Sequence, residues 1–263
     1  MRVKKGRIVD NFHYFCIVIN ICGDFMIVFK SKNLIIISVL IATIFTIIFC
    51  IGSIVVQPTG EAYANKIRVV LDAGHGGIDG GVSGVNTGVK ESELNLKVVK
   101  KIEKYLISAG MSVSLTRNSN AGLYGIATKN LKRRDMEKRR DIIKSFKPNV
   151  VISVHMNKYS LSTRRGAQVF YKKSDENAKL LASSIQNNFN QMEEASRDCS
   201  ILSGDYYILN CTEYTSVIAE CGFLSNPEDE ALLITDEYQD KIAYCIFKGI
   251  VGYLAQSSFD YNK

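Results

Sequence analysis

Apolar and polar positions alternate along residues 65–263 in a pattern that predicts short strands separated by helices. Short apolar runs predict buried strands at 68–71, 111–116, 150–154, 166–171 and 216–219. Apolar residues that recur every three or four positions predict helices over 91–109, 131–146, 175–190 and 236–255. Because strands alternate with helices, we expect an α/β fold whose largely parallel or mixed sheet is covered by helices.

A different pattern precedes this domain. Residues 34–56 form an almost uncharged apolar run that is long enough to span a bilayer as a helix. Lys30 and Lys32 precede the run and Glu61 is the first charge after it, so the positive-inside rule predicts export of everything that follows. A small-residue pattern at 62–64 resembles a signal-peptidase site. The pattern leaves open whether the segment is a cleaved signal peptide or a retained membrane anchor.

We therefore divide the chain into four parts. An N-terminal extension without structure (1–33) is followed by the signal or anchor helix (34–56), a short linker (57–64) and one domain (65–263). Met26 would make a more usual start for an exported protein than Met1, and we interpret residues 1–25 as an upstream extension. The domain is expected to work outside the cytoplasm, on the outer side of the membrane or in the cell wall.

Charge and cysteine content exclude several classes of protein. The net charge of +7 falls to +4 for residues 65–263, which hold 27 basic and 23 acidic residues. This mild excess suits a polyanionic envelope and gives no case for nucleic-acid binding. A basic run at 129–147 is interpreted as a solvated helix face, with an acidic partner or the anionic wall as the alternative. The four cysteines of the domain form no CxxC pair, so we expect buried thiols rather than a disulfide framework or a cysteine-histidine zinc site.

Two histidines lie where α/β proteins place their chemistry. The strand at 68–71 leads into a loop dense in glycine, which permits positive φ and close approach of backbone to a ligand. His75 lies in this loop, and His155 follows the strand at 150–154. A lone histidine at a strand end is more often structural. Because the domain has two in this setting and none elsewhere, we favour a functional role for both.

Two glutamates complete the candidate site. Glu91 opens the first helix of the domain, where an acid could simply complement the helix dipole, but the glycine loop joins it to His75. Glu220 ends the apolar strand at 216–219, where a carboxylate without a partner is costly to bury. An ion pair with Arg117 or Arg139 is the alternative explanation for Glu220.

Two imidazoles and one carboxylate, with water in a fourth position, are typical of a catalytic zinc site. A further carboxylate beside the water would supply a general base for hydrolysis of an amide. The chain has no HExxH helix, which argues against a thermolysin-like site. It also has no GxSxG motif, although a serine or cysteine nucleophile paired with either histidine stays conceivable.

These motifs together resemble the zinc-dependent N-acetylmuramoyl-L-alanine amidases (the Amidase_3 family). The resemblance rests on LDAGHGGIDGG (71–81), Glu91, LTR (115–117), SVHMN (153–157) and ECGFLSN (220–226). It implies a mixed, mostly parallel sheet of about six strands with helices on both faces. It also implies one zinc ion held by His75, Glu91 and His155, with Glu93 as the fallback ligand and Glu220 as the catalytic carboxylate. Arg139 matches a recurrent arginine whose role we take to be structural, and Ala73 departs from the usual proline.

The resemblance is to the germination-specific, CwlD-type branch of this family. It implies hydrolysis of the amide bond between the lactyl group of N-acetylmuramic acid and L-alanine in the peptidoglycan of spore cortex, before muramic-δ-lactam forms. The alternatives are a vegetative autolysin or division amidase, a zinc peptidase that acts on wall peptides, and a non-catalytic envelope-binding protein. Peptidoglycan is the expected partner, together with the membrane at the N-terminus and, as in other exported amidases, an activating protein.

Overall fold

The computed structural model describes residues 17–20, 26–29, 31–52, 67–195 and 197–260. The chain divides into two compact units, residues 1–58 and 59–263, and each is described by itself.

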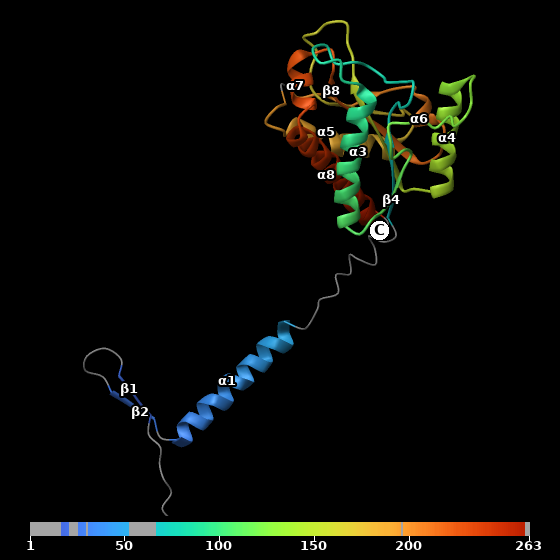
Figure 1. Cartoon of the computed structure of the whole chain (residues 1–263). Helices are drawn as coiled ribbons and strands as arrows, with labels where there is room; N and C mark the ends of the chain where they lie inside the picture. The colour runs from blue at the N-terminus through green and yellow to red at the C-terminus, as the bar shows by residue number, and fades with distance from the viewer. Residues whose placement is uncertain (1–16, 21–25, 30, 53–66, 196, 261–263) are drawn as a thin grey trace, which may run out of the picture. The chain divides into compact units, whose positions relative to one another are not determined.

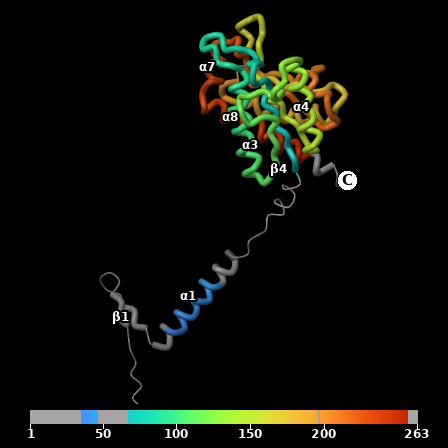
Figure 2. The backbone as a smooth tube through the Cα atoms, turned by 45° about the vertical axis from the view of Figure 1, so that its right-hand side comes forward, coloured from blue at the N-terminus to red at the C-terminus, as the bar shows by residue number. Residues whose placement is uncertain are grey.

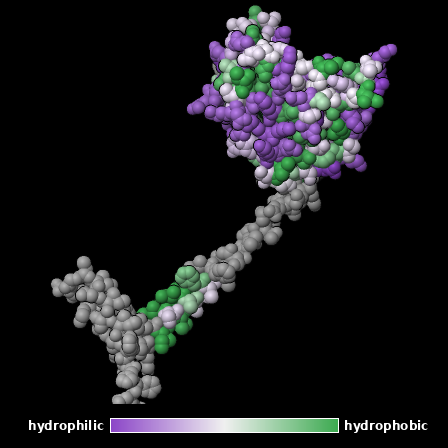
Figure 3. Space-filling view, in the orientation of Figure 1, coloured by the Kyte–Doolittle hydropathy of each residue, from purple (hydrophilic) through white to green (hydrophobic). Residues whose placement is uncertain are grey.

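The described residues of the first unit form two short strands and one helix. Strands β1 (Ile17–Asn20) and β2 (Met26–Phe29) lie within the predicted N-terminal extension and pair antiparallel. Helix α1 (Ser31–Gly52) covers most of the apolar run predicted to be helical, and residues 53–56 of that run lie outside the described residues. Figure 3 shows the apolar side chains exposed on α1. Within the described part of the chain, no helix combines the length and the apolar character that crossing a membrane requires.

The second unit is built on one mixed sheet of six strands (Figure 1). Along the sheet the strands run in the order β4-β3-β5-β8-β6-β7, and the first four are parallel to one another. Strand β6 is antiparallel to β8, and the short β7 is parallel to β6. The strands are β3 (Arg68–Ala73), β4 (Ser112–Leu115), β5 (Val150–Asn157), β6 (Gln168–Tyr171), β7 (Leu202–Ser203) and β8 (Thr215–Phe223).

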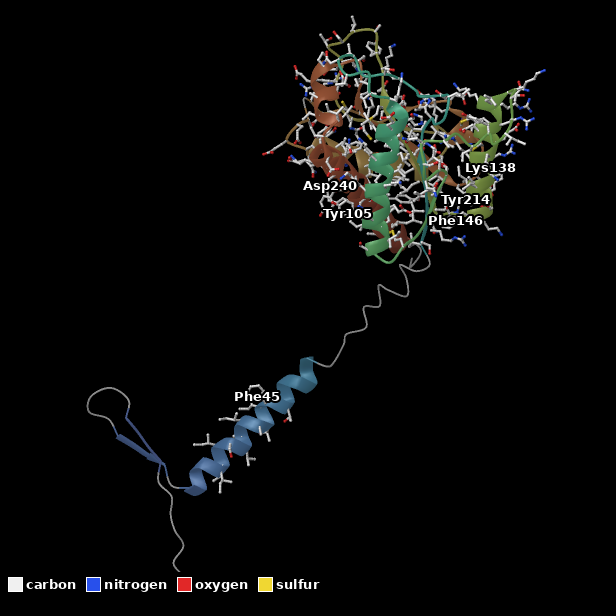
Figure 4. The ribbon with its side chains drawn as sticks, viewed as in Figure 1. Phe45, Tyr105, Lys138, Phe146, Tyr214 and Asp240 are labelled. Atoms are coloured by element: carbon white, nitrogen blue, oxygen red, sulfur yellow. The ribbon has the colours of Figure 1, made fainter. Side chains whose placement is uncertain are left out.

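Helices cover both faces of this sheet (Figures 1 and 2). Helices α3 (Glu91–Ser108), α5 (Glu176–Asn190) and α8 (Asp236–Asp260) pack on one face, and α4 (Leu131–Phe146) and α6 (Tyr207–Asn210) pack on the other. Successive strand residues point to opposite faces, so Val69 and Leu71 join the larger core while Val70 joins the smaller one. Helix α7 (Pro227–Leu233) follows β8. The Tyr105 hydroxyl of α3 donates to Asp240 of α8 at 2.8 Å, as their positions in Figure 4 illustrate.

The predicted α/β fold is confirmed, and the differences concern short elements. All five predicted strands and four predicted helices are present, with β5 and β8 running three and four residues further than expected. The sequence patterns missed β7 and α6 because elements of two and four residues are too short to show a period. Helix α7 had a usable signal, since the Asn226 side chain accepts hydrogen bonds from the Glu228 and Asp229 amides and Pro227 occupies the first helical turn.

A buried ion pair fixes the loop that follows β3. The Arg139 guanidinium of α4 donates to the Asp72 carboxylate at 2.6 Å and to Asp135 at 2.6 Å. It also donates to the backbone carbonyls of Ala73 at 2.8 Å and His75 at 2.6 Å. Arg139 therefore has the structural role that the sequence suggested, and it holds the first turn of the glycine loop against the sheet.

Arg117 holds the same loop from the other side. Its guanidinium donates to the carbonyls of Ala73, Gly74 and Ser92 at 2.8, 2.9 and 2.7 Å. Both arginines are thus committed to backbone carbonyls, and neither forms the ion pair with Glu220 that the sequence allowed as an alternative.

Asp72 is charged because of these partners. Burial alone would raise the pKa of this carboxyl, but the Arg139 guanidinium and the hydroxyls of Ser153 and Thr116 lower the pKa to about 2. A carboxyl whose pKa is lower in the folded than in the unfolded state stabilises the fold above its unfolded pKa, and this stabilisation is lost as the pH falls.

We expect Asp72→Asn to lower the free energy of unfolding at pH 7 by about 2–4 kcal/mol, because the buried Arg139 loses its charged partner. Between about pH 4 and pH 2 the variant should lose less stability than the wild type, since Asp72 no longer titrates there. Urea unfolding across this range measures both quantities, with the exposed Asp198→Asn as the control. A variant that keeps the wild-type acid dependence would contradict the role given to Asp72.

The centre of the sheet should be sensitive to cavities. Ile152 is fully buried in β5, so Ile152→Ala is expected to cost about 2–5 kcal/mol of unfolding free energy. Ile107 of α3 is 55% exposed, and the same change there should cost well under half as much. Denaturant unfolding of the two variants provides the comparison. Equal losses at the two positions would show that β5 is not the core of the domain.

Candidate metal centre and catalytic site

The site lies where the parallel strands β3, β5 and β8 end. His75 follows β3 by two residues, His155 lies near the end of β5, and Glu220 lies in β8 directly beside His155 in the strand register. Glu91 is the first residue of α3. Because the carboxyl ends of parallel strands meet at one edge of a sheet, four residues from distant parts of the sequence reach one place.

Three of these residues form a compact group. One carboxylate oxygen of Glu91 lies 2.9 Å from His155 Nδ1 and 3.2 Å from His75 Nε2. The two imidazole rings meet edge to face with their centroids 5.0 Å apart. Among the residues that the structure describes, this is the one group of three histidine, cysteine or acidic side chains whose donor atoms all come within 4.8 Å of one another. No cysteine takes part, as the sequence indicated.

The donor set fits a divalent metal ion. Ligands held roughly 2.0–2.2 Å from an ion in tetrahedral geometry lie about 3.3–3.6 Å from each other, a few tenths of an ångström more than the 2.9 and 3.2 Å that separate Glu91 from the two imidazoles. Nitrogen and carboxylate donors from three residues leave a coordination position open for water or substrate. The predicted ligands His75, Glu91 and His155 therefore come together. Glu93, the fallback, is exposed and takes no part.

Glu91 is held as an anion. Burial would raise the pKa of its carboxyl, but hydrogen bonds with His155 and His75 outweigh burial and lower the pKa. The backbone amides of Val82 and Met156 also donate to its carboxylate, at 2.9 and 3.2 Å. A buried carboxylate that is charged before any cation arrives is preorganised to bind one.

The glycine loop bends so that its histidine can reach this group. His75 itself has a left-handed backbone, with φ 61°, and Gly76 and Gly77 also have positive φ. At Gly74 a Cβ atom would overlap the His155 imidazole, and at Gly81, whose φ is 67°, it would overlap the Glu91 carboxylate. Glycine at these two positions is therefore required by close packing against two of the candidate ligands.

Supporting residues that the sequence analysis did not single out surround the group. Asp79 Oδ1 lies 2.9 Å from His75 Nδ1, so it orients the imidazole and leaves Nε2 facing Glu91. The Asn95 amide donates to Glu91 Oε1 at 3.3 Å and to the Gly74 carbonyl at 3.0 Å. Asp79 follows His75 by four residues, and Asn95 follows Glu91 by four. Because residues four apart lie on the same face of a helix, the contact between Glu91 and Asn95 could have been predicted from the sequence.

Glu230 of α7 supports the loop from further away. Its carboxylate accepts hydrogen bonds from the amides of Asn86 and Thr87 at 2.7 and 2.8 Å, just before the chain enters α3. The partners are more than 140 residues apart in sequence, so no local pattern could have revealed the contact.

Glu220 differs from Glu91 in its surroundings. Its side chain is partly buried, and its buried Oε2 atom has no hydrogen-bond partner among the described residues. Burial raises the pKa of this carboxyl to about 7, partly offset by the nearby histidines. A carboxyl that titrates near neutrality can accept a proton from water and later return it to a leaving group.

One cavity of about 690 Å³ contains all four residues. His75, Glu91, His155 and Glu220 line it, together with the first turns of α4 and the tyrosines around α6. The other lining residues include Ile78, Tyr124, Leu131, Lys132, Met136, Lys158, Tyr206 and Tyr207. Among the described hydrogen bonds, no serine or cysteine side chain contacts either imidazole, so a nucleophile paired with histidine has no support.

Comparison with known proteins agrees with this geometry. Residues 69–251 match the Amidase_3 family, described as N-acetylmuramoyl-L-alanine amidase. The chain is 36% identical over 205 residues to a germination-specific N-acetylmuramoyl-L-alanine amidase of Bacillus subtilis (strain 168), covering 76% of this chain and 84% of that protein.

Two solved structures extend the comparison. The CwlD amidase from Clostridioides difficile, solved in complex with the GerS lipoprotein, has a TM-score of 0.69 at 34% identity and covers 72% of this chain and 98% of its own. The catalytic domain of CwlV, an N-acetylmuramoyl-L-alanine amidase from Bacillus (Paenibacillus) polymyxa var. colistinus, has a TM-score of 0.62 at 29% identity and covers 72% and 98%.

The family match spans more than half of the chain and includes both histidines and both glutamates of the site. The chain therefore belongs to the Amidase_3 family and is an N-acetylmuramoyl-L-alanine amidase that acts on peptidoglycan.

Proposed function

We propose that the enzyme is zinc-dependent, that His75, Glu91 and His155 hold one zinc ion, and that Glu220 is the catalytic carboxylate. The observation that carries this proposal is the meeting of a preorganised histidine–glutamate–histidine group with a partly buried carboxylate whose Oε2 atom has no hydrogen-bond partner among the described residues, all in one cavity. The two glutamates have opposite environments, one stabilised as an anion and one near its titration point, which suits a ligand and a proton carrier respectively.

When bound, zinc would polarise the scissile carbonyl and lower the pKa of water in the site. Glu220 accepts a proton as water adds to the carbonyl carbon that joins the lactyl group to L-alanine. Glu220 then gives that proton to the departing amine, and the carbon–nitrogen bond breaks. The products are a free lactyl carboxylate and a peptide with a free L-alanine amino group.

We also propose a setting in the spore cortex, outside the cytoplasm. Support comes from the similarity to a germination-specific amidase over three quarters of the chain and to the CwlD amidase over a similar share. An activating protein partner is proposed because that CwlD was solved with a lipoprotein. The basic-then-apolar pattern before residue 57 supports export and membrane association.

We expect the purified full-length chain to contain about one zinc ion, and His75→Ala to lose most of it, because one of three protein ligands is gone. Elemental analysis of the two proteins measures this directly. His13→Ala provides a matched control, since this histidine is far from the domain in sequence. Full zinc retention in His75→Ala would remove His75 from the ligand set.

Glu220→Gln should keep zinc and lose turnover by roughly 10²–10⁴-fold, because glutamine cannot carry the proton. Release of new amino termini from peptidoglycan measures turnover, and elemental analysis measures zinc. Glu93→Gln changes an exposed carboxylate near the site and should leave both unchanged.

The identity of the product separates the alternatives. Mass spectrometry of the released fragments should show peptides that begin with L-alanine and glycan strands of unchanged length. Cleavage between two amino acids of the peptide would instead indicate a zinc peptidase, and substantial turnover by Glu220→Gln would refute the role of Glu220.

A further inference from the structure

Most of the net charge of the chain is concentrated around one helix. Residues 129–147, which comprise α4 and its flanks, hold nine basic and three acidic residues, a net charge of +6 against +7 for the whole chain. Helix α3 has four basic and three acidic residues by comparison. Side chains tipped with nitrogen crowd the outer side of α4 in Figure 4, where Lys138 is labelled.

Three of the nine basic residues have evident structural partners. Arg139 is buried against Asp72 and Asp135, Arg133 pairs with Glu137 at 2.8 Å, and Arg140 pairs with Asp141 at 2.9 Å. The other six are exposed, and none has an ion-pair partner among the residues that the structure describes. We call them the α4 basic face: Lys129, Lys132, Arg134, Lys138, Lys144 and Lys147.

A solvated helix usually mixes both signs of charge, because like charges on one helix repel. The sheet-facing side of α4 is satisfied by the buried residues Asp135, Arg139 and Ile143, so packing does not require the exposed lysines. An unpaired positive surface of this size attracts polyanions and raises their local concentration.

The N-terminal end of α4 borders the catalytic cavity. Lys132, Leu131 and Met136 line the cavity, so the first turns of α4 form one of its walls. The helix has 16 residues and is about 24 Å long, so the basic face reaches well beyond the reacting bond. The parts of a polymeric substrate that lie outside the cavity must pass over one of its walls. The peptide side chains of peptidoglycan carry carboxylates, which a basic surface attracts.

We propose that the α4 basic face binds carboxylates of peptidoglycan peptides that neighbour the one being cleaved. The inference rests on the proposed function, since it takes peptidoglycan as the substrate of this cavity. The face holds the polymer by charge and leaves the chemistry to the four site residues. A small soluble fragment has no neighbouring peptides and does not need it.

The test compares binding with turnover. The triple variant Arg134→Gln, Lys138→Gln, Lys144→Gln in the full-length chain removes three charges and leaves Lys132 in the cavity wall intact. Its affinity for insoluble peptidoglycan stripped of phosphate polymers, measured by co-sedimentation on ice, should fall about tenfold at low salt. The dependence of binding on NaCl should become shallower. Hydrolysis of a soluble disaccharide-peptide monomer should keep its kcat/KM.

Matched control variants separate the effect of lost positive charge on α4 from a general effect of substitution on the fold. Lys97→Gln, Lys100→Gln, Lys104→Gln removes three exposed charges from α3, on the opposite face of the sheet, and should bind as the wild type does. Arg134→Lys keeps the charge and should also keep full binding. Conversion of the polymer's carboxylates to neutral amides should abolish the difference between wild type and triple variant.

Several results would overturn the inference. The inference fails if the α3 and α4 triple variants bind peptidoglycan equally well, or if the wild type binds the amidated polymer as strongly as the untreated one. It also fails if the wild type binds only peptidoglycan that keeps its phosphate polymers. Capture of an acidic protein without salt-sensitive binding to peptidoglycan would assign the face to a protein partner instead. If the wild type binds peptidoglycan through α4 but does not hydrolyse the monomer, the inference about the α4 basic face is supported and the proposed catalytic function is refuted.

Discussion

The buried pair between Asp72 and Arg139 is the interaction on which the site depends. It joins the end of β3 to α4 and, through the same guanidinium, fixes the carbonyls of the two residues that frame the start of the glycine loop. A buried pair adds little to stability relative to an apolar one, but loss of either partner leaves a charge stranded. Its value lies in position, because it sets where His75 leaves the sheet.

From that point the site is assembled in two different ways. His155 and Glu220 lie side by side on neighbouring strands, so the sheet itself fixes their separation. His75 and Glu91 come from the two ends of a loop that is tied down by arginines, by Asp79 and by Glu230. The candidate proton carrier Glu220 is therefore on a strand of the sheet, whereas two of the three candidate ligands are on a segment shaped by hydrogen bonds.

The sequence predicted those features that depend only on a residue and its near neighbours along the chain. Apolar runs revealed the strands, and residues at the strand ends revealed His155 and Glu220, because in parallel sheets chemistry gathers at those ends. The choice of Glu91 over Glu93 needed the family resemblance, since periodicity alone does not say which of two acids in a first turn faces inward. The contact of Glu230 with Thr87 was out of reach, because it depends on how α7 returns to a loop far away in the chain. Patterns in a single sequence therefore predict helices and strands well, but they predict the tertiary contacts between them poorly.

The left-handed backbone at His75 has a consequence for reading related sequences. A side chain in this conformation costs about 1 kcal/mol or more, which glycine would avoid, and the residues on both sides are already glycine. In return the imidazole contacts Asp79 at 2.9 Å and Glu91 at 3.2 Å, so the strained backbone places it in the candidate metal centre. If His75 holds the proposed ion, a related protein that does not bind one has no need of a side chain in this conformation, and glycine would relieve the strain. Glycine at the position of His75 in a related sequence would therefore indicate a site that no longer uses the imidazole.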